Sequence, residues 1–245
     1  MNDKSNETYR TPADWGTDSL GYFIEAARHN TIAAFANLRQ QYDVLTDIDR
    51  LYGEMIENLD HSPELVPGFL LFRTHSSFRA AVCLCLSGQI VEAFMVLRGC
   101  LESALYGLYV AEDANRQEVW LRRHDDDASR RRVRNEFTIR NVLNHLQSID
   151  ANRHGIAQSL YERTIDYGAH PNPRAVHTQI KTESAGSRFI VTAQYFLCGD
   201  LPHRASLKST AQIGICCLDI FYTVFRDRYR ILGIDQRLDH IRQGL

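Results

Sequence analysis

The sequence predicts an all-α protein, a single helical bundle of about six to seven helices with a possible small β-hairpin near residues 176–197. Over most of the chain, apolar residues recur three and four positions apart, which is the spacing of a buried helix face. Strand-like alternation occurs only near residues 176–197, around a turn-like Ala185-Gly186. We therefore expect a helical-bundle domain over residues 19–245, preceded by a polar arm, residues 1–18, that is disordered or loosely attached.

The first expected helix spans residues 19–59, with a break near Asn30. Ser62 before Pro63 is suited to start the next one. A helical hairpin then runs from Pro67 to Val110 and folds at Ser87-Gly88-Gln89. Its second arm is apolar on nearly all sides, which is typical of the central helix of a bundle.

Small residues four positions apart also lie on this arm, at Gly99, Ser103 and Gly107. Glycine costs about 1 kcal/mol in a helix interior. We therefore expect a neighbouring helix to pack closely against this stripe.

Two charged residues, Arg98 and Glu102, interrupt the same arm, and their i, i+4 spacing allows an ion pair. If the arms are antiparallel about Gly88, Arg79 lies near Arg98, and Arg73 or His75 lies near Glu102. The charges either form a structural ion pair or line a polar pocket in the bundle interior. The second interpretation makes Arg79, Arg98 and Glu102 ligand-binding candidates.

Further helices are expected over residues 115–123, 129–149, 152–167, 207–231 and 235–243. The third of these should end at Gly168. The turn that follows it contains Pro171 and Pro173, which restrict the backbone and hold His170 and Asn172 in place. These two residues either join the ligand-binding candidates or only stop the helix.

Composition limits the functional classes. Apolar residues make up 44% and charged residues 24% of the chain, as in ordinary globular proteins. A net charge of −2 gives no general attraction to nucleic acid or an anionic membrane. The six cysteines form no C-x-x-C motif and lie mostly in apolar helical runs, so we expect reduced core thiols and a cytoplasmic protein. We expect no signal peptide and no membrane span.

Motifs for nucleotides and metals are absent from the sequence, including the P-loop, G-x-G-x-x-G, H-E-x-x-H and zinc-ligand spacings. The acidic cluster His124 to Asp127 is better suited to cap the next helix than to bind a cation. The Arg130, Arg131, Arg132 and Arg134 run predicts a solvated face, with contact to phosphates as the alternative. We expect no cofactor and no metal.

The segment Arg140-Asn141-Val142-Leu143-Asn144-His145 resembles the Arg, polar residue, three variable residues, His motif of HEPN domains. Those domains are all-helical bundles, and many of them are metal-independent ribonucleases of toxin and defence systems. The resemblance covers at most residues 66–170. It implies catalytic Arg140 and His145, a supporting Asn141, RNA as the substrate and a homodimer that builds the site. The Arg-x-x-x-Glu helix with a later His-Pro turn also resembles uncharacterised bacterial helical-bundle proteins, which supply no activity.

Two functional hypotheses follow. The first is a non-enzymatic intracellular binding or regulatory module for a partner protein or small ligand, with a polar site in the bundle interior. The alternative is a HEPN-like ribonuclease. An enzyme that binds an anion or nucleotide through the arginine run is a third class, for which no motif argues.

Overall fold

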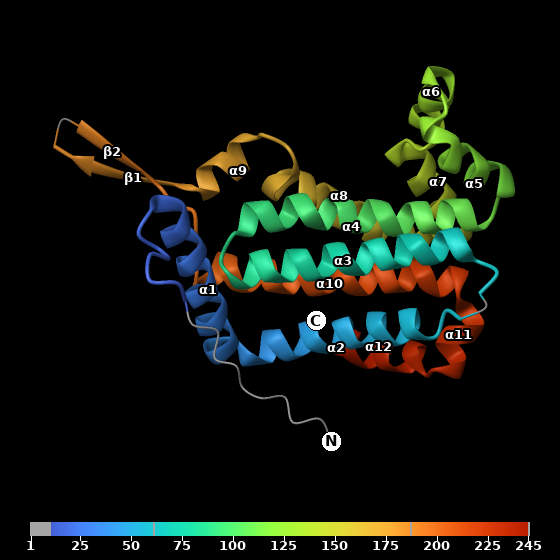
Figure 1. Cartoon of the computed structure of the whole chain (residues 1–245), viewed down its shortest axis with the longest axis horizontal. Coiled ribbons are helices and arrows are strands. Elements are labelled where there is room, and N and C mark those ends of the chain that lie inside the picture. Colours follow the sequence, from blue (N-terminus) through green and yellow to red (C-terminus); the bar gives the residue numbers. More distant parts are fainter. Residues whose placement is uncertain (1–10, 61, 187, 245) are drawn as a thin grey trace.

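The computed structural model describes residues 11–60, 62–186 and 188–244. Within them the chain forms twelve α-helices, a short 3-10 turn, a π-helical turn and one two-stranded sheet (Figure 1). The elements in chain order are α1 (Ser19–Asn37), α2 (Arg39–Glu57), α3 (Leu65–Leu86), α4 (Ile90–Ala111), α5 (Ala114–Leu121), η1 (Arg122–His124), α6 (Asp127–Glu136), α7 (Ile139–Ile149), α8 (Ala151–Thr164), η2 (Ile165–Ala169), α9 (Pro173–Thr178), β1 (Ile180–Ala185), β2 (Arg188–Ala193), α10 (Leu201–Val224), α11 (Arg226–Ile231) and α12 (Ile234–Gln243).

The long helices α2, α3, α4 and α10 lie side by side and form the body of the molecule (Figure 1). The predicted hairpin is confirmed: α3 and α4 pack along their length, and Gly88 turns the chain with φ at +88°. Helix α10 packs against α2, α3, α4 and α8. The prediction of a mostly helical bundle is therefore confirmed.

Glycines let α10 approach its neighbours closely. A Cβ atom at Gly107 of α4 would lie 2.6 Å from the Phe221 ring, and one at Gly214 of α10 would lie 2.6 Å from the Phe78 ring. The expected close packing at the small-residue stripe is thus confirmed at Gly107. It is wrong at Gly99, where a Cβ would meet nothing within 4 Å. Helix α4 has an open side, on which Met95 is also exposed.

The number of helices exceeds the predicted six to seven because three expected helices are divided, residues 19–59, 129–149 and 207–231, and because α9 was not expected. The break between α1 and α2 falls at Leu38, and not at Asn30, which stays helical. Leu38 is buried and no side chain caps α2, so the core fixes this break without a polar signal. Thr138 divides residues 129–149, because its hydroxyl accepts from Asn141 N and starts α7.

The expected β-hairpin is confirmed over a shorter span, since residues 173–178 form α9. Strands β1 and β2 pair antiparallel, with Ile180 opposite Ala193 and Ala185 opposite Arg188. The β-hairpin projects from one end of the molecule (Figure 1), and β2 is exposed along its whole length.

The expected N-terminal arm lies partly outside the described residues, which begin at Thr11. Residues 11–18 form a turn beside α1. Asp18 caps that helix through Leu20 N and Gly21 N, and Trp15 Nε1 donates to Glu25 at 3.2 Å.

Two helices reach the length and apolarity of a membrane span: α3 and α4 each have 22 residues and a mean hydropathy of 1.2. Core helices of bundles also reach these values. In the most apolar stretch of 18 residues in α4, 61% of the residues are buried inside the protein.

His203, in the first turn of α10, links the residues before this helix to the turn between α3 and α4. Its Nδ1 accepts a hydrogen bond from Gly199 N at 3.0 Å, so Nε2 carries the proton and donates to Cys85 O at 2.8 Å. Nearby, Leu197 N donates to Gly88 O at 2.9 Å. Burial lowers the pKa of His203, because a cationic ring would lose solvent and could no longer accept from Gly199.

The unfolding free energy should fall as the pH is lowered from about 7 to 5.5. An unfolded histidine binds a proton near pH 6.5, whereas folded His203 binds it only at a lower pH. The contribution of His203 is therefore complete above about pH 6.5 and is lost below it. Urea unfolding across this range measures the slope.

The variant His203→Gln should be less stable at pH 7 and should show a shallower slope. Part of the slope should persist, because burial also lowers the pKa values of His75 and His145. Equal slopes in variant and wild type would show that His203 does not carry the effect.

Candidate functional site

The predicted pair of Arg98 and Glu102 forms, with Arg98 Nε 2.9 Å from Glu102 Oε1. Two further side chains join it. The Tyr161 hydroxyl of α8 donates to Glu102 Oε1 at 3.1 Å, and Arg98 Nη1 lies 2.7 Å from His170 Nε2. Because the guanidinium can only donate, His170 Nε2 is the acceptor in this contact. We call these four residues the Arg98 network.

The Arg98 network lies at the edge of the bundle, under α8 and the turn after it. The Arg98 side chain is 26% exposed and the Glu102 side chain 35%. The structure therefore places this pair in a half-buried position and not in the fully buried interior expected from the apolar character of α4. Burial and the Glu102 carboxylate raise the pKa of Tyr161 to about 12, so its hydroxyl stays protonated and donates.

The π-helical turn η2 and the proline-containing turn that follows it place His170 next to Arg98. The expected end of α8 at Gly168 is wrong, because the chain continues from Thr164 into the π-helical turn η2. Gly168 has φ at 177° and its backbone touches α4, where a Cβ atom would overlap with Val91 O. Asn172 then caps α9 and donates to the carbonyls of Ile165 and His170.

Arg79 does not join this network. It lies between α2 and α3, where its Nε and Nη2 lie 2.7 and 3.0 Å from the two Asp49 oxygens. His75 Nε2 lies 2.7 Å from Asp49 Oδ1. The expected proximity of Arg79 to Arg98, and of His75 to Glu102, is wrong because both side chains point towards α2. Burial alone would raise the pKa of Asp49, but Arg79 and His75 lower it.

The three HEPN-motif residues lie on α7 and are engaged separately. Asn141 Nδ2 donates to the carbonyls of Asn135 and Glu136, at the end of α6. His145 lies one turn further along the same side of the helix, with Nε2 3.1 Å from Glu112 Oε2 and Nδ1 3.5 Å from Arg116 Nη1.

Arg140 itself is exposed. On a regular helix, five positions leave Arg140 and His145 roughly 140° apart. No hydrogen bond joins the two among the described residues.

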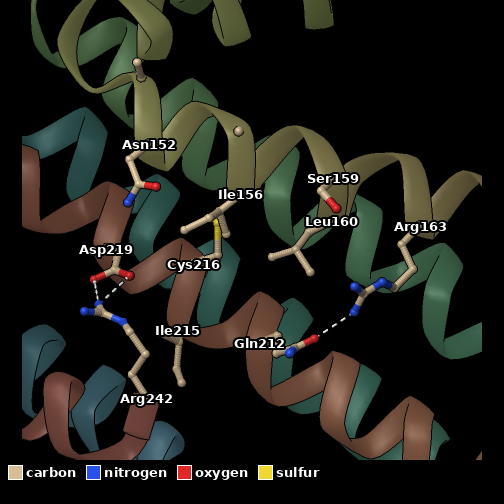
Figure 2. Close-up of a pocket in the computed structure, with 12 residues that line it drawn as sticks. Asn152, Ile156, Ser159, Leu160, Arg163, Gln212, Ile215, Cys216, Asp219 and Arg242 are labelled. Carbon is tan, nitrogen blue, oxygen red and sulfur yellow. Dashed lines mark hydrogen bonds and ion pairs between the residues drawn. The ribbon is translucent and has the colours of Figure 1, made fainter.

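A groove also lies between α8 and α10. One cavity in this groove has a volume of about 490 Å³. Figure 2 shows Arg163 and Gln212 at one end of it and Asp219 and Arg242 at the other. Arg242 Nη2 lies 2.6 and 2.7 Å from the two Asp219 oxygens. The floor between these ends is apolar, formed by Ile156, Leu160, Ile215 and Cys216.

A second cavity, of about 620 Å³, continues the groove beyond Arg163 and Gln212, which line both cavities. Its apolar wall includes Phe94 and Tyr167, whose rings stack with centroids 5.4 Å apart. Lys208 lies on its rim. We call the two cavities together the α8–α10 groove.

The sequence alone does not predict the residues of this groove. Arg163 and Gln212 are separated by 48 intervening positions, and each looks like an ordinary solvated residue on an amphipathic helix. The available signal was weak: Arg163 interrupts the apolar spacing of Leu160, Thr164 and Tyr167.

Comparison of the chain with models of protein families, with curated proteins and with solved structures gives no match. The resemblances to HEPN domains and to bacterial helical-bundle proteins therefore rest on sequence pattern alone. A function for this chain has to come from the geometry of its own residues.

Replacement of Gly168 should separate η2 from α4. Gly168→Ala should lower the unfolding free energy by about 1–3 kcal/mol, the usual cost of overpacking, since the new methyl group overlaps with Val91 O. Gly155→Ala is the matched control. Gly155 lies on α8, the helix that leads into η2, where a Cβ meets nothing within 4 Å, so this change should stabilise the protein by up to about 1 kcal/mol. Thermal and urea unfolding measure both, and equal effects of the two would contradict the close approach at Gly168.

Proposed function

We propose that the chain is a non-enzymatic binding module whose α8–α10 groove takes a small ligand with an apolar body and one anionic group. The groove has the dimensions of small-molecule sites, which are commonly about 300–1,000 Å³ and mostly apolar with a few polar groups. Its two cavities fit this description.

The observation that carries the proposal is the set of hydrogen-bond partners of Arg163. This half-buried guanidinium stands where the two cavities meet and donates to neutral groups, Gln212 Oε1 at 2.7 Å and Ser209 Oγ at 3.2 Å. Among the described residues, no carboxylate pairs with it. A cation that is partly desolvated and bonded only to neutral acceptors gains a strong, charge-assisted bond from an anionic ligand.

The other charges of the groove favour the same ligand class. In the second cavity, the charged lining residues are Arg163 and Lys208, both cationic. In the first cavity, Asp219 is already held by both oxygens to Arg242. Because Arg242 neutralises this carboxylate at both oxygens, Asp219 adds little repulsion towards an anion.

In this proposal the Arg98 network supports the groove from outside. The network ties His170 to α4, and Tyr167 precedes His170 by three residues on the same turn. Holding this turn in place keeps the Tyr167 ring stacked on Phe94, where the two rings form the groove wall. Arg98, Glu102, His170 and Asn172 then position the site without touching the ligand.

Decanoate is a suitable probe, because it combines an apolar chain with one carboxylate. We expect Arg163→Met to weaken its binding roughly 10- to 100-fold, since the variant keeps the apolar stem and loses a hydrogen bond to a charged group worth about 1.5–3 kcal/mol. Isothermal titration calorimetry measures both affinities.

Arg140→Met is the matched control, because it makes the same charge change on the exposed side of α7 and should leave the affinity unchanged. Decanol should bind much more weakly than decanoate. The proposal fails if decanoate does not bind, if decanol binds equally well, or if the two arginine variants behave alike.

The non-enzymatic part of the proposal is tested against the ribonuclease hypothesis. We expect no cleavage of RNA in EDTA by the purified wild-type protein, since Asn141 caps α6 and Arg140 lies away from His145. Cleavage that disappears in His145→Ala would establish the ribonuclease instead.

A further inference from the structure

The outer side of the α3–α4 hairpin is not covered by any described element of the chain. A single stripe on α3 and a shorter one on α4 make up this surface, which we call the hairpin face: Leu65, Phe69, Phe72, Ser76, Ala80 and Cys83 on α3, and Met95, Gly99 and Ser103 on α4. The spacings of three and four place each set on one side of its helix. Four large apolar side chains on this face are mostly exposed: Leu65 at 60%, Phe69 at 58%, Phe72 at 62% and Met95 at 51%.

Large and small residues are segregated on the hairpin face. On α3 the large residues precede Ser76, and the small residues follow it. On α4 the order is the same, with Met95 before Gly99 and Ser103 after it. Because the two helices are antiparallel, each end of the face has a large patch on one helix and a small patch on the other.

This arrangement is complementary to itself. Ser76 lies twelve residues before the Gly88 turn and Gly99 lies eleven residues after it, so the two residues occupy about the same level of the hairpin. A two-fold axis at that level, perpendicular to both helices, pairs each helix with its own copy in antiparallel orientation. The opposing pairs are then Phe72 with Ala80, Phe69 with Cys83 and Met95 with Ser103, each a large residue against a small one. An interface of this kind must match a surface to itself.

We propose that a second copy of this chain packs on the hairpin face about this two-fold axis. The centre of the face permits close approach, since a Cβ at Gly99 would meet nothing within 4 Å. None of the nine residues is charged. Exposed Arg73 and Arg79 flank the α3 stripe, and the axis places Arg73 of one copy opposite Arg79 of the other. Arg79 lies to the side and is neutralised by Asp49.

The four large side chains of the hairpin face supply about half of the area that a standard dimer interface requires. A standard interface covers about 800 Å² on each partner. The four large side chains, each more than half exposed, supply about 400 Å² per copy, given that large side chains bury roughly 150–250 Å² each. In this proposal the other half comes from the small residues between them and from the rim of the hairpin.

Sedimentation equilibrium and a cysteine cross-link test the proposal together. The wild-type protein should sediment as a dimer at micromolar concentration. Ala80→Glu should convert it to a folded monomer, because the new charge faces Phe72 of the other copy. Ala128→Glu makes the same change at an exposed position of α6, so this variant should remain dimeric.

The cross-link reports on the register. In a Cys83→Ser, Cys198→Ser background, Ser76→Cys lies beside its own copy at the axis and should form a covalent dimer under mild oxidation. Gln147→Cys, which is exposed on α7, should not.

Three results would overturn the proposal: a wild-type monomer at 100 µM, a dimer that Ala80→Glu leaves intact, or cross-linking at Gln147→Cys but not at Ser76→Cys. Vesicles of phosphatidylglycerol and phosphatidylethanolamine provide the remaining comparison. Co-sedimentation of a monomer with these vesicles, lost in Ala80→Glu, would assign the hairpin face to a lipid surface.

Discussion

The close approach of α10 to the α3–α4 hairpin is the constraint on which the rest of the structure depends. It requires a missing side chain on each side, Gly107 on α4 for the Phe221 ring and Gly214 on α10 for the Phe78 ring. The rings fill the space that the glycines leave, so the helices lie near one another and still enclose a dense core. With α10 fixed in this position, α2 and α8 can pack on it, and the groove between α8 and α10 follows from that placement.

The polar side chains on α4 have a different role from its apolar ones. The Arg98–Glu102 pair is partly exposed, and such pairs contribute at most about 1 kcal/mol of net stability. The pair instead fixes the positions of two other side chains, because Glu102 accepts a hydrogen bond from the Tyr161 hydroxyl and Arg98 donates one to His170. A weak interaction can therefore decide where a turn lies, while the apolar contacts decide that the domain is folded.

The sequence was sufficient for the features that depend on local spacing. The hairpin, its turn at Gly88, the Arg98–Glu102 pair and the β-hairpin follow from periodicity and from the conformational preferences of glycine. The break at Leu38 could not be predicted, since a buried leucine without a capping side chain gives no polar signal. The groove residues Arg163 and Gln212 belong to two helices that meet only in the tertiary structure.

The case of Arg79 shows the same limit within the hairpin. Counting residues about the turn gave its level along the helix correctly, but it did not give the direction of the side chain. Asp49 of α2 decides that direction, and nothing in α3 or α4 indicates that α2 lies on that side.

The projecting β-hairpin is energetically separate from the bundle. A two-stranded sheet is marginally stable by itself in water, and the strands β1 and β2 bury almost no side chain against the helices. The free energy that opens these strands is therefore much smaller than the free energy that unfolds the core. Amide hydrogens of the hairpin can exchange with solvent while the bundle stays intact. Insertions or cleavage in this segment would leave the remaining fold undisturbed, so its length can change without loss of the core.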